Sequence, residues 1–568
     1  MQFLESDPVF FVTISKHLYH PGSTMQKKYI VCFLVSWGIL LSLQVNSAEP
    51  ERRYRIIHNN DGSDALGNYW FHKRPLTVHD VNAYVDMVSH SQVTTYMMCT
   101  GSDFFYYRSK HGRILGDDLD RKLDCGNDTA ATHHYKSFYL NHLNLEKDGT
   151  DLIEASLKRA KMHGMEAFIT YRMNDLHFND TTTNCPITYP EFWYTHPEFW
   201  TNDDTPGLNG SRALDFAHPE VRAHKLAIIT EQLERYEMID GLDLDFMRFI
   251  VYFKQGEGKK NAFLMTELMK EVKVKVDELS EKRGKKILLS VRVPLTVRDC
   301  LDKGLDIQEW IRLGLVDFIT IGVHWRGNPS LPVAQFIKEL GSTTVPVYAT
   351  IDDGGYKPRE TFSHGMFRGM ASHILSQGAD GIYLFNHYYG AFNSTYQGLL
   401  HLEEGGQVCR VISPHLIQEL GSPETLAYRN KIYCLSDGVT EYGIKHISSL
   451  PLEVRSDDFS KAEIFIGDDP GKTVPEEVIL FVRSSKQASF TLKVNGRDIT
   501  HSEPDYVSLY DKGRGLMVGE CQYAFVLPVE SIQQGYNTVA FHAADSSLLV
   551  KRVEIALKYG DVKTHGYF

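Results

Sequence analysis

Two hydrophobic periodicities alternate along the chain from residue 52 to residue 395. Short apolar runs of strand length are followed by longer segments whose apolar residues recur every three or four positions, and several of these segments end in glycine, a common helix stop. Strands that alternate with helices indicate a parallel sheet. Eight such units predict a (β/α)8 TIM barrel, with a doubly wound sheet as the alternative. The expected strands are 52–59, 93–99, 166–174, 241–247, 286–294, 317–325, 346–352 and 381–387.

The periodicity changes after the eighth strand. Residues 396–440 read as a linking region, and residues 441–568 contain short alternating runs without helical segments. The Asn495-Gly496 pair lies between two such runs and is a strong hairpin signal. The C-terminal part is therefore predicted to be an all-β sandwich, jelly-roll-like, that either binds carbohydrate or braces the barrel.

The N-terminal segment resembles a secretory signal in its composition. Two lysines precede an apolar run of about seventeen residues, which is at the short limit for a membrane span, and the small residues Ser47 and Ala48 follow. We expect a signal peptide over 25–48 that is cleaved near Ala48, with an uncleaved anchor as the alternative. The mature protein would be secreted or periplasmic and would have no stable membrane span. Residues 1–24 are expected to be an upstream extension, so translation starts at either Met1 or Met25.

Charge and composition exclude some partners. A net charge of −12 and a pI near 6.1 argue against a nucleic-acid partner, which would need a basic face. No phosphate-binding glycine motif or zinc-type spacing is present, so no cofactor is expected. Seven of the eight cysteines follow the signal; this odd number defines no disulfide framework and leaves Cys125–Cys185 and Cys409–Cys434 as candidate pairs.

Alternation along the expected strands assigns side chains to the inside of the barrel. In GLDLDFM, Asp243 and Asp245 share the inward face, with Asp243 the deeper of the two. Buried charges need partners, so we expect Asp243 to be a structural charge paired with Arg172 or Arg292, and Asp245 to be reactive. The other inward residues expected by the same rule are Thr170, Arg172, Asn174, Ser290, Arg292, Thr320, His324, Tyr348, Thr350 and Asp352.

Carboxylates on the fourth and seventh strands would face each other across the mouth of such a barrel. Glycoside hydrolysis needs one carboxyl group to protonate the leaving oxygen and another to attack the sugar or activate water. Asp245, Asp352 and Asp353 are therefore the predicted catalytic residues. A divalent cation held by Asp243, Asp245, His324 and Asp352 is an alternative, although two arginines facing the same lumen weigh against it, and no metal site is predicted.

Long loops rich in aromatic and polar residues follow the second and third strands, over 100–150 and 175–217. In a barrel these loops lie on the C-terminal face, where active sites form, so they predict a cleft for an extended polar ligand such as a poly- or oligosaccharide. The predicted substrate-binding residues are Asn60, Asp61, Arg172, Asn174, Asp175, His177, Trp193, Arg248, Arg292, His324, Trp325, Asn386 and His387.

Several motifs together resemble the secreted family-10-like glycosyl hydrolases, a glycosidase-related TIM-barrel group with a C-terminal β-sandwich. They are ALDFAHPEVRAHKLAIITEQLERYEMIDGLDLDFMRF (213–249), IIHNNDGSD on the first strand, YRMND on the third and DGIYLFNHYY on the eighth. The resemblance implies a hydrolase that cleaves glycosidic bonds in poly- or oligosaccharides.

The chain departs from this pattern at the catalytic positions. Related retaining barrel glycosidases carry Glu at the ends of the fourth and seventh strands, whereas this chain has Asp245 and Asp352/Asp353. The shorter side chain widens the gap toward the roughly 6.5–9.5 Å of inverting enzymes, against about 5–5.5 Å for retaining ones. An inverting mechanism, a carbohydrate-binding pseudoenzyme without turnover and a metal-dependent hydrolase remain alternatives.

Overall fold

The chain divides into two compact units, Met1–Arg53 and Tyr54–Phe568. The computed structural model describes parts of the second unit only, so the predicted signal peptide and upstream extension lie outside the described residues. The described residues are 55–62, 74–118, 122–202, 212–323, 328–352, 363–385, 387, 416–436, 440–441, 444–445, 448–500, 519–544 and 547–565.

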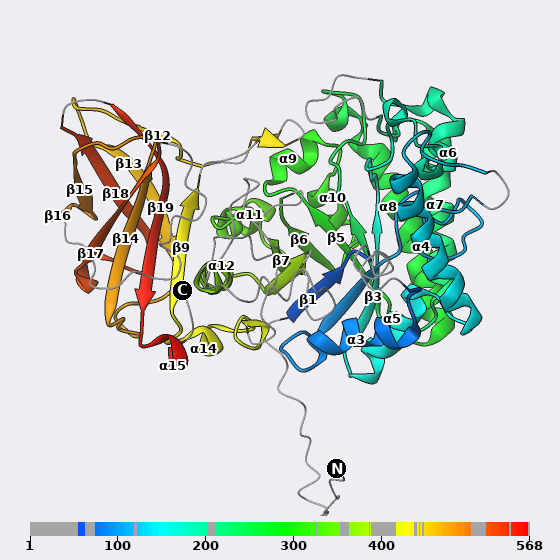
Figure 1. Cartoon of the computed structure of the whole chain (residues 1–568), viewed down its shortest axis with the longest axis horizontal. Helices are drawn as coiled ribbons and strands as arrows, with labels where there is room; N and C mark the ends of the chain where they lie inside the picture. The colour runs from blue at the N-terminus through cyan, green and yellow to red at the C-terminus, as the bar shows by residue number, and fades with distance from the viewer. Residues whose placement is uncertain are drawn as a thin grey trace, which may run out of the picture. The chain divides into compact units, whose positions relative to one another are not determined.

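Eight parallel strands close into a barrel in the order β1-β2-β3-β4-β5-β6-β7-β8, which confirms the predicted TIM barrel (Figure 1). Each strand pairs in parallel with the next, and β1 pairs with β8 to complete the ring. The strands are β1 Arg55–Asn60, β2 Thr95–Cys99, β3 Glu166–Arg172, β4 Gly241–Asp245, β5 Leu288–Val293, β6 Phe318–Ile321, β7 Val347–Asp352 and β8 Gly381–Phe385.

Helices surround the barrel strands (Figure 1). Local sequence sets their ends: Asp151 accepts a hydrogen bond from the backbone N–H of Glu154 at the start of α5, and Gly284 ends α8 in the left-handed conformation that glycine favours. Among the described residues, no helix combines the length and apolarity needed to cross a bilayer. The helices are α3 Val78–Ser89, α4 Thr129–Lys147, α5 Leu152–Met162, α6 Glu191–Thr195, α7 Pro219–Arg235, α8 Gly258–Arg283, α9 Val297–Asp302, α10 Ile307–Arg312, α11 Val333–Leu340, α12 His364–Ser376, α14 Pro423–Leu426 and α15 Val562–His565.

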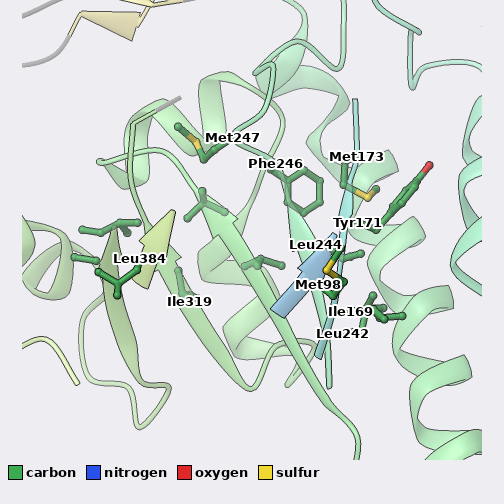
Figure 2. Close-up of a cluster of buried hydrophobic side chains, with 14 of the residues drawn as sticks. Met98, Ile169, Tyr171, Met173, Leu242, Leu244, Phe246, Met247, Ile319 and Leu384 are labelled. Atoms are coloured by element: carbon green, nitrogen blue, oxygen red, sulfur yellow. The ribbon is translucent and has the colours of Figure 1, made fainter. Parts of the chain in front are cut away.

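Alternation along each strand separates the outer core from the lumen. Residues such as Leu242 and Leu244 belong to the large hydrophobic cluster that also includes helix residues, and Figure 2 shows them with neighbours from β2 and β3. The opposite faces of the strands meet inside the barrel, where a separate apolar cluster lies. Its members are Ile57, Met97, Phe168, Phe318, Tyr348, Tyr383 and Phe385.

The C-terminal part forms two antiparallel sheets around a second hydrophobic core, which confirms the predicted all-β domain. One sheet has the order β12-β19-β14-β17, with β9 also paired to β19, and the other has the order β13-β18-β15-β16. β9 falls within the segment predicted to link the domains, so the sandwich begins before residue 441. The remaining strands are β9 Lys431–Ser436, β10 Thr440–Glu441, β11 Ile444–Lys445, β12 Leu452–Val454, β13 Ser460–Ile466, β14 Glu477–Ser484, β15 Phe490–Val494, β16 Arg497–Ile499, β17 Cys521–Leu527, β18 Gly535–Ala543 and β19 Leu548–Lys558.

Helix α12 packs against β9 and joins the barrel to the sandwich. A Cβ at Gly369 of α12 would overlap the carbonyl of Ile432 on β9, so the two backbones can be this close only because residue 369 is glycine. The hydroxyl of Tyr433 donates a hydrogen bond to the carboxylate of Asp468 at 2.7 Å and lies 2.8 Å from the hydroxyl of Ser372 on α12.

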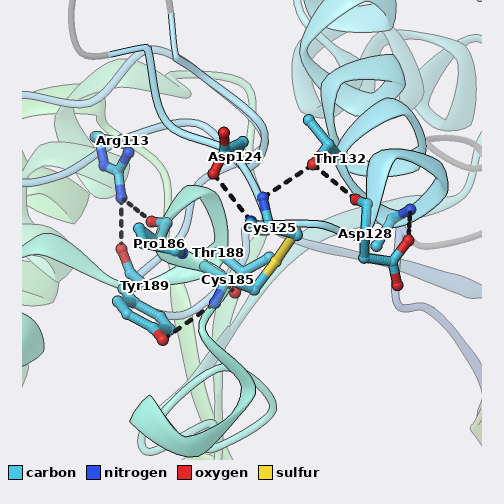
Figure 3. Close-up of a disulfide and its surroundings, with 11 residues drawn as sticks. Arg113, Asp124, Cys125, Asp128, Thr132, Cys185, Pro186, Thr188 and Tyr189 are labelled. Carbon is cyan, nitrogen blue, oxygen red and sulfur yellow. Dashed lines mark hydrogen bonds between the residues drawn. A yellow bond between two sulfur atoms is a disulfide. The ribbon is translucent and has the colours of Figure 1, made fainter.

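A disulfide joins Cys125 to Cys185, which confirms the first of the two predicted pairs (Figure 3). It links the loop after β2 to the loop after β3, on the side of the barrel where the candidate site lies. Of the second predicted pair, Cys434 donates a hydrogen bond to Glu554 at 3.9 Å, and Cys409 lies outside the described residues.

Candidate active site at the C-terminal mouth of the barrel

The aspartates of β4 face the lumen at two different levels. Asp243 is in register with Thr170 on β3 and Ser290 on β5, whereas Asp245 is in register with the two arginines Arg172 and Arg292. Both side chains are buried. The predicted inward orientation and difference in depth are therefore confirmed, and the register places hydroxyl groups beside one carboxylate and guanidinium groups beside the other.

Asp243 is held by hydroxyl groups. Its carboxyl oxygens accept hydrogen bonds from Ser290 at 2.6 Å, Thr170 at 3.0 Å and Tyr383 at 3.5 Å. Burial raises the pKa of Asp243 to about 6; these hydroxyl bonds oppose the rise, and the negative charge of Asp245 reinforces it. The expected pairing of Asp243 with an arginine is wrong, because neither arginine is in register with it.

Asp245 forms that ion pair instead. Nη1 of Arg292 lies 3.2 and 3.1 Å from its two carboxylate oxygens, and the backbone N–H of Met247 donates to it at 2.8 Å. The Arg292 side chain is fully buried, also donates to the carbonyl of Val323, and stacks on Phe385 with its guanidinium carbon 4.0 Å from the ring centroid. The residue expected to be reactive is therefore anchored by a buried guanidinium.

The seventh strand ends at Asp352, three strands around the ring from β4. Asp352 is fully buried and is in register with Phe385 of β8, the same ring on which Arg292 stacks. Asp352 is thus a strand neighbour of Phe385, whereas Asp245 is connected to the same ring only through Arg292. Asp353 lies outside the described residues.

A network of charges lies above these aspartates. Arg172 bridges Asp61 at 3.3 Å and Asp175 at 2.9 Å, so it ties the end of β1 to the segment after β3. Asp175 also bonds to Nδ1 of His177, whose Nε2 lies 3.2 Å from Nη2 of Arg248. Because a guanidinium only donates, Nε2 accepts in this contact, and Nδ1 carries the proton shared with Asp175.

Asp175 is held in its charged form by this network. Burial alone would raise its pKa, but His177, Arg172 and Arg248 together hold the pKa of Asp175 well below its usual range. Asp175 is thus a fixed negative charge that positions Arg172 and His177. Five of the predicted substrate-binding residues therefore form one cluster at the mouth of the barrel: Asp61, Arg172, Asp175, His177 and Arg248.

A cavity of about 160 Å³ opens beside this cluster. One part of its wall is aromatic, from Phe104, Tyr106 and Phe178, and another part is charged, from residues that include Arg172 and Arg248. The aromatic residues come from the loops after β2 and β3. The sequence predicts a cleft at these loops but does not single out these three side chains within them.

Three other predicted binding residues serve the framework instead. Trp193 is fully buried, stacks on Trp200 at a centroid separation of 4.7 Å and donates to the carbonyl of Arg212. Asn174 is fully buried and donates to two backbone carbonyls, those of Leu214 and Val251. His387 is buried with Nε2 2.8 Å from the carbonyl oxygen of Ile351, and burial lowers its pKa to about 4.

The remaining predicted residues are only partly described. Asn60 donates to the hydroxyl of Tyr96 at 2.9 Å and accepts from the backbone of Gly62, so it shapes the turn after β1. His324, Trp325 and Asn386 lie outside the described residues. Within the described ranges, no three His, Cys, Asp or Glu side chains are grouped so that they could hold a metal ion.

A buried ion pair behind the cavity was missed from the sequence. Lys225 of α7 is fully buried and reaches both carboxylate oxygens of Asp103, at 2.8 and 2.9 Å, while Asp103 itself lines the cavity. Burial tends to raise the pKa of Asp103, but the charge of Lys225 and the bond to His224 lower it to about 2. The burial of Lys225 could have been inferred from helical spacing, because Lys225 shares the apolar face of α7 with Val221 and Ile229.

Comparisons with known proteins find no matching family model and no matching curated protein. Among solved structures, a cycloisomaltooligosaccharide glucanotransferase from Paenibacillus sp. is 10% identical with a TM-score of 0.32, and the match covers 88% of this chain and 57% of that chain. A putative alpha-L-fucosidase from Bacteroides thetaiotaomicron is 9% identical with a TM-score of 0.34, covering 90% and 96%. The PgaB (BpsB) glycoside hydrolase domain from Bordetella bronchiseptica is 11% identical with a TM-score of 0.37, covering 65% and 99%. At these values the likenesses assign neither a family nor an activity.

Proposed function

We propose that the protein is a glycoside hydrolase that cleaves a glycosidic bond in a poly- or oligosaccharide at the C-terminal mouth of its barrel. The observation that carries the proposal is the pair of strand-end carboxylates, Asp245 on β4 and Asp352 on β7, at the ends of strands that are three positions apart around the ring. Glycosidases need two carboxyl groups on either side of the bond that they cleave.

The surroundings of Asp245 suggest how the two roles divide. Arg292 offsets the charge of Asp245 and holds the carboxylate in one orientation, which suits a nucleophile or a base that activates water. Asp352 then protonates the leaving oxygen. Asp243, one level deeper, has a pKa raised to about 6 by burial and supports the position of β4 through its hydroxyl partners.

The loops on this face supply the sugar-binding surface. Aromatic rings stack on the apolar faces of sugar rings, and the cavity beside the mouth presents Phe104, Tyr106 and Phe178. Charged and amide groups nearby can bond to hydroxyl groups. This combination suits a polar ligand with apolar faces, which is the chemistry of a carbohydrate.

The test is loss of cleavage in two separate variants, Asp245→Asn and Asp352→Asn. The purified protein is incubated with a panel of polysaccharides, and newly formed reducing ends are measured. Each variant is expected to lower kcat by a factor on the order of 10² to 10⁴, the usual contribution of a general acid or base. If either variant keeps the rate of the wild type, the assignment of that residue is wrong.

Asp240→Asn is the matched control. Asp240 immediately precedes the same strand at its opposite end, where it bonds to Lys161, Lys285 and the backbone of Ala167. The same loss of charge at that end should leave kcat unchanged. A fall in rate equal to that of Asp245→Asn would show that the effect is structural rather than catalytic.

Binding without cleavage is the second candidate function. It is favoured by the burial of Asp245 and Asp352, whose exposed fractions are 2% and 0%. A protein that binds a glycan in calorimetric titration but releases no reducing ends across the panel would establish this function and refute hydrolysis.

A further inference from the structure

Arg248 has donors that no neighbour uses. Its side chain is buried, and among the described residues Nε and Nη1 have no hydrogen-bond partner, while Nη2 bonds only to the imidazole of His177. Buried donors without acceptors cost on the order of 1–3 kcal/mol, and more when the group is charged. An arrangement of this kind is retained where an acceptor arrives from outside, as a ligand or as water.

The charge of Arg248 is also not offset by a bonded carboxylate. Arg172, its neighbour in the cavity wall, has one terminal nitrogen on Asp61 and the other on Asp175. Arg248 makes no ion pair within the described part of the chain. The cavity therefore has one guanidinium that is already neutralised by two acids and one that is available to a further anion.

Arg248 lies where the cavity meets the barrel mouth. It lines the cavity together with Phe104, and its guanidinium carbon is 5.6 Å from the ring centroid of Phe385. The guanidinium of Arg292, which holds Asp245, is 4.0 Å from that same ring centroid. A group bound at Arg248 would thus lie near Phe385, the ring on which the guanidinium that holds Asp245 is stacked.

We propose that this cavity is a subsite for an anionic sugar, with the guanidinium of Arg248 receiving the carboxylate or sulfate group of an acidic glycan. A guanidinium has two planar edges, Nε–Nη2 and Nη1–Nη2, and His177 takes only one of the two Nη2 hydrogens, so one edge keeps both of its donors. Such an edge donates two parallel hydrogen bonds and so matches a carboxylate or a sulfate better than a single hydroxyl. The aromatic wall formed by Phe104, Tyr106 and Phe178 receives the apolar face of the same ring. The inference rests on the proposed function, since it takes a glycan as the ligand, and it narrows the substrate to acidic glycans.

The test compares acidic probes with uncharged counterparts of nearly the same shape. Trigalacturonate and a hyaluronan tetrasaccharide are titrated against their methyl esters, and a sulfated carrageenan tetrasaccharide against its desulfated form, in calorimetric titrations of the full-length protein. At least one acidic probe is expected to bind about tenfold or more tightly than its counterpart, the ratio of one charge-assisted hydrogen bond. The carboxylate and sulfate arms show which anion the site prefers.

Substitutions of Arg248 test whether this side chain causes the preference for acidic over uncharged probes. Arg248→Gln is expected to lower the affinity for the acidic probe to that for its uncharged counterpart and to leave the latter unchanged. Arg248→Lys keeps the charge without the planar edge and should retain part of the affinity ratio between the acidic probe and its uncharged counterpart. Arg298→Gln, which removes an equal charge from a side chain that is 89% exposed, should leave this affinity ratio unchanged.

Three results would overturn the inference: equal binding of every acidic probe and its counterpart, no binding of any acidic probe, or a ratio that survives in Arg248→Gln. Melting temperatures of the variants show whether each is folded. The titrations require no turnover, so they are separate from the test of hydrolysis. A protein that cleaves glycans without a charge preference refutes the subsite alone, and one that prefers acidic glycans without cleaving them refutes hydrolysis alone.

Discussion

Removal of Arg292 should be among the most costly single substitutions in the barrel. In Arg292→Met the apolar length of the side chain is kept, but Asp245 loses the guanidinium that lies 3.1–3.2 Å from both of its oxygens. Asp245 is 2% exposed and cannot recover this interaction from water, and Asp243 lies two residues away on the same face of β4. Breaking a buried ion pair from one side costs about 3–5 kcal/mol, and we expect the free energy of unfolding to fall by this amount.

A double-mutant cycle separates the ion pair from the lost packing of Arg292 on Phe385. The free energy of unfolding is measured by urea denaturation for the wild type, Arg292→Met, Asp245→Asn and the double variant. The double variant should be more stable than the sum of the two single effects predicts by about 2 kcal/mol or more, because it has no unpaired buried charge.

An exposed pair provides the control. Arg312 and Glu309 of α10 form an ion pair in which the arginine side chain is 67% exposed. Arg312→Met should therefore change the free energy of unfolding by less than about 1 kcal/mol. The reasoning would be refuted if Arg292→Met cost no more than Arg312→Met, or if the effects of the Arg292 and Asp245 substitutions were simply additive.

Three further predictions concern stability. Burial raises the pKa of Asp243 from its ordinary value of 3.8 to about 6, so the folded state binds this proton more tightly and stability falls as pH rises from about 4 to 6. Asp243→Asn should reduce that fall by about 2 kcal/mol in urea titrations at pH 4 and pH 7, and an unchanged pH dependence would contradict this prediction. Replacing Cys125 and Cys185 by serine opens a loop closed across a sequence separation of 60, and should lower the free energy of unfolding by about 4 kcal/mol, with reductant destabilising only the wild type. Gly369→Ala would push α12 from the carbonyl of Ile432 and should cost about 1–3 kcal/mol, whereas an unchanged melting temperature would show that this contact is not tight.

The architecture of the barrel was predictable because it depends on periodicity along single segments. Alternation with a period of two correctly oriented Asp243 and Asp245 toward the lumen, and the sequence of strand and helix patterns indicated a closed ring. Neither inference requires knowledge of how one strand is shifted against the next.

The partners inside the lumen were not predictable for that same reason. Whether Arg292 reaches Asp243 or Asp245 depends on the stagger between β4 and β5, which alternation does not specify; the register aligns Arg292 with Asp245 and Ser290 with Asp243. Trp193 was misassigned because a tryptophan in a polar loop has the same local pattern whether it faces a ligand or packs on Trp200. Composition predicts an aromatic surface but not which rings remain accessible.

Helix α12 has a consequence for how this protein could be divided or recombined. Every residue from Gly365 to Leu375 is buried, so α12 has barrel on one side and β9 of the sandwich packed against another, with no face left for solvent over that span. A barrel helix normally keeps a polar outer surface. Here the sandwich covers the face of α12 that a barrel helix would otherwise expose to solvent, so the sandwich forms part of the outer layer of the barrel at this helix. Neither domain can therefore be exchanged for another without also redesigning α12.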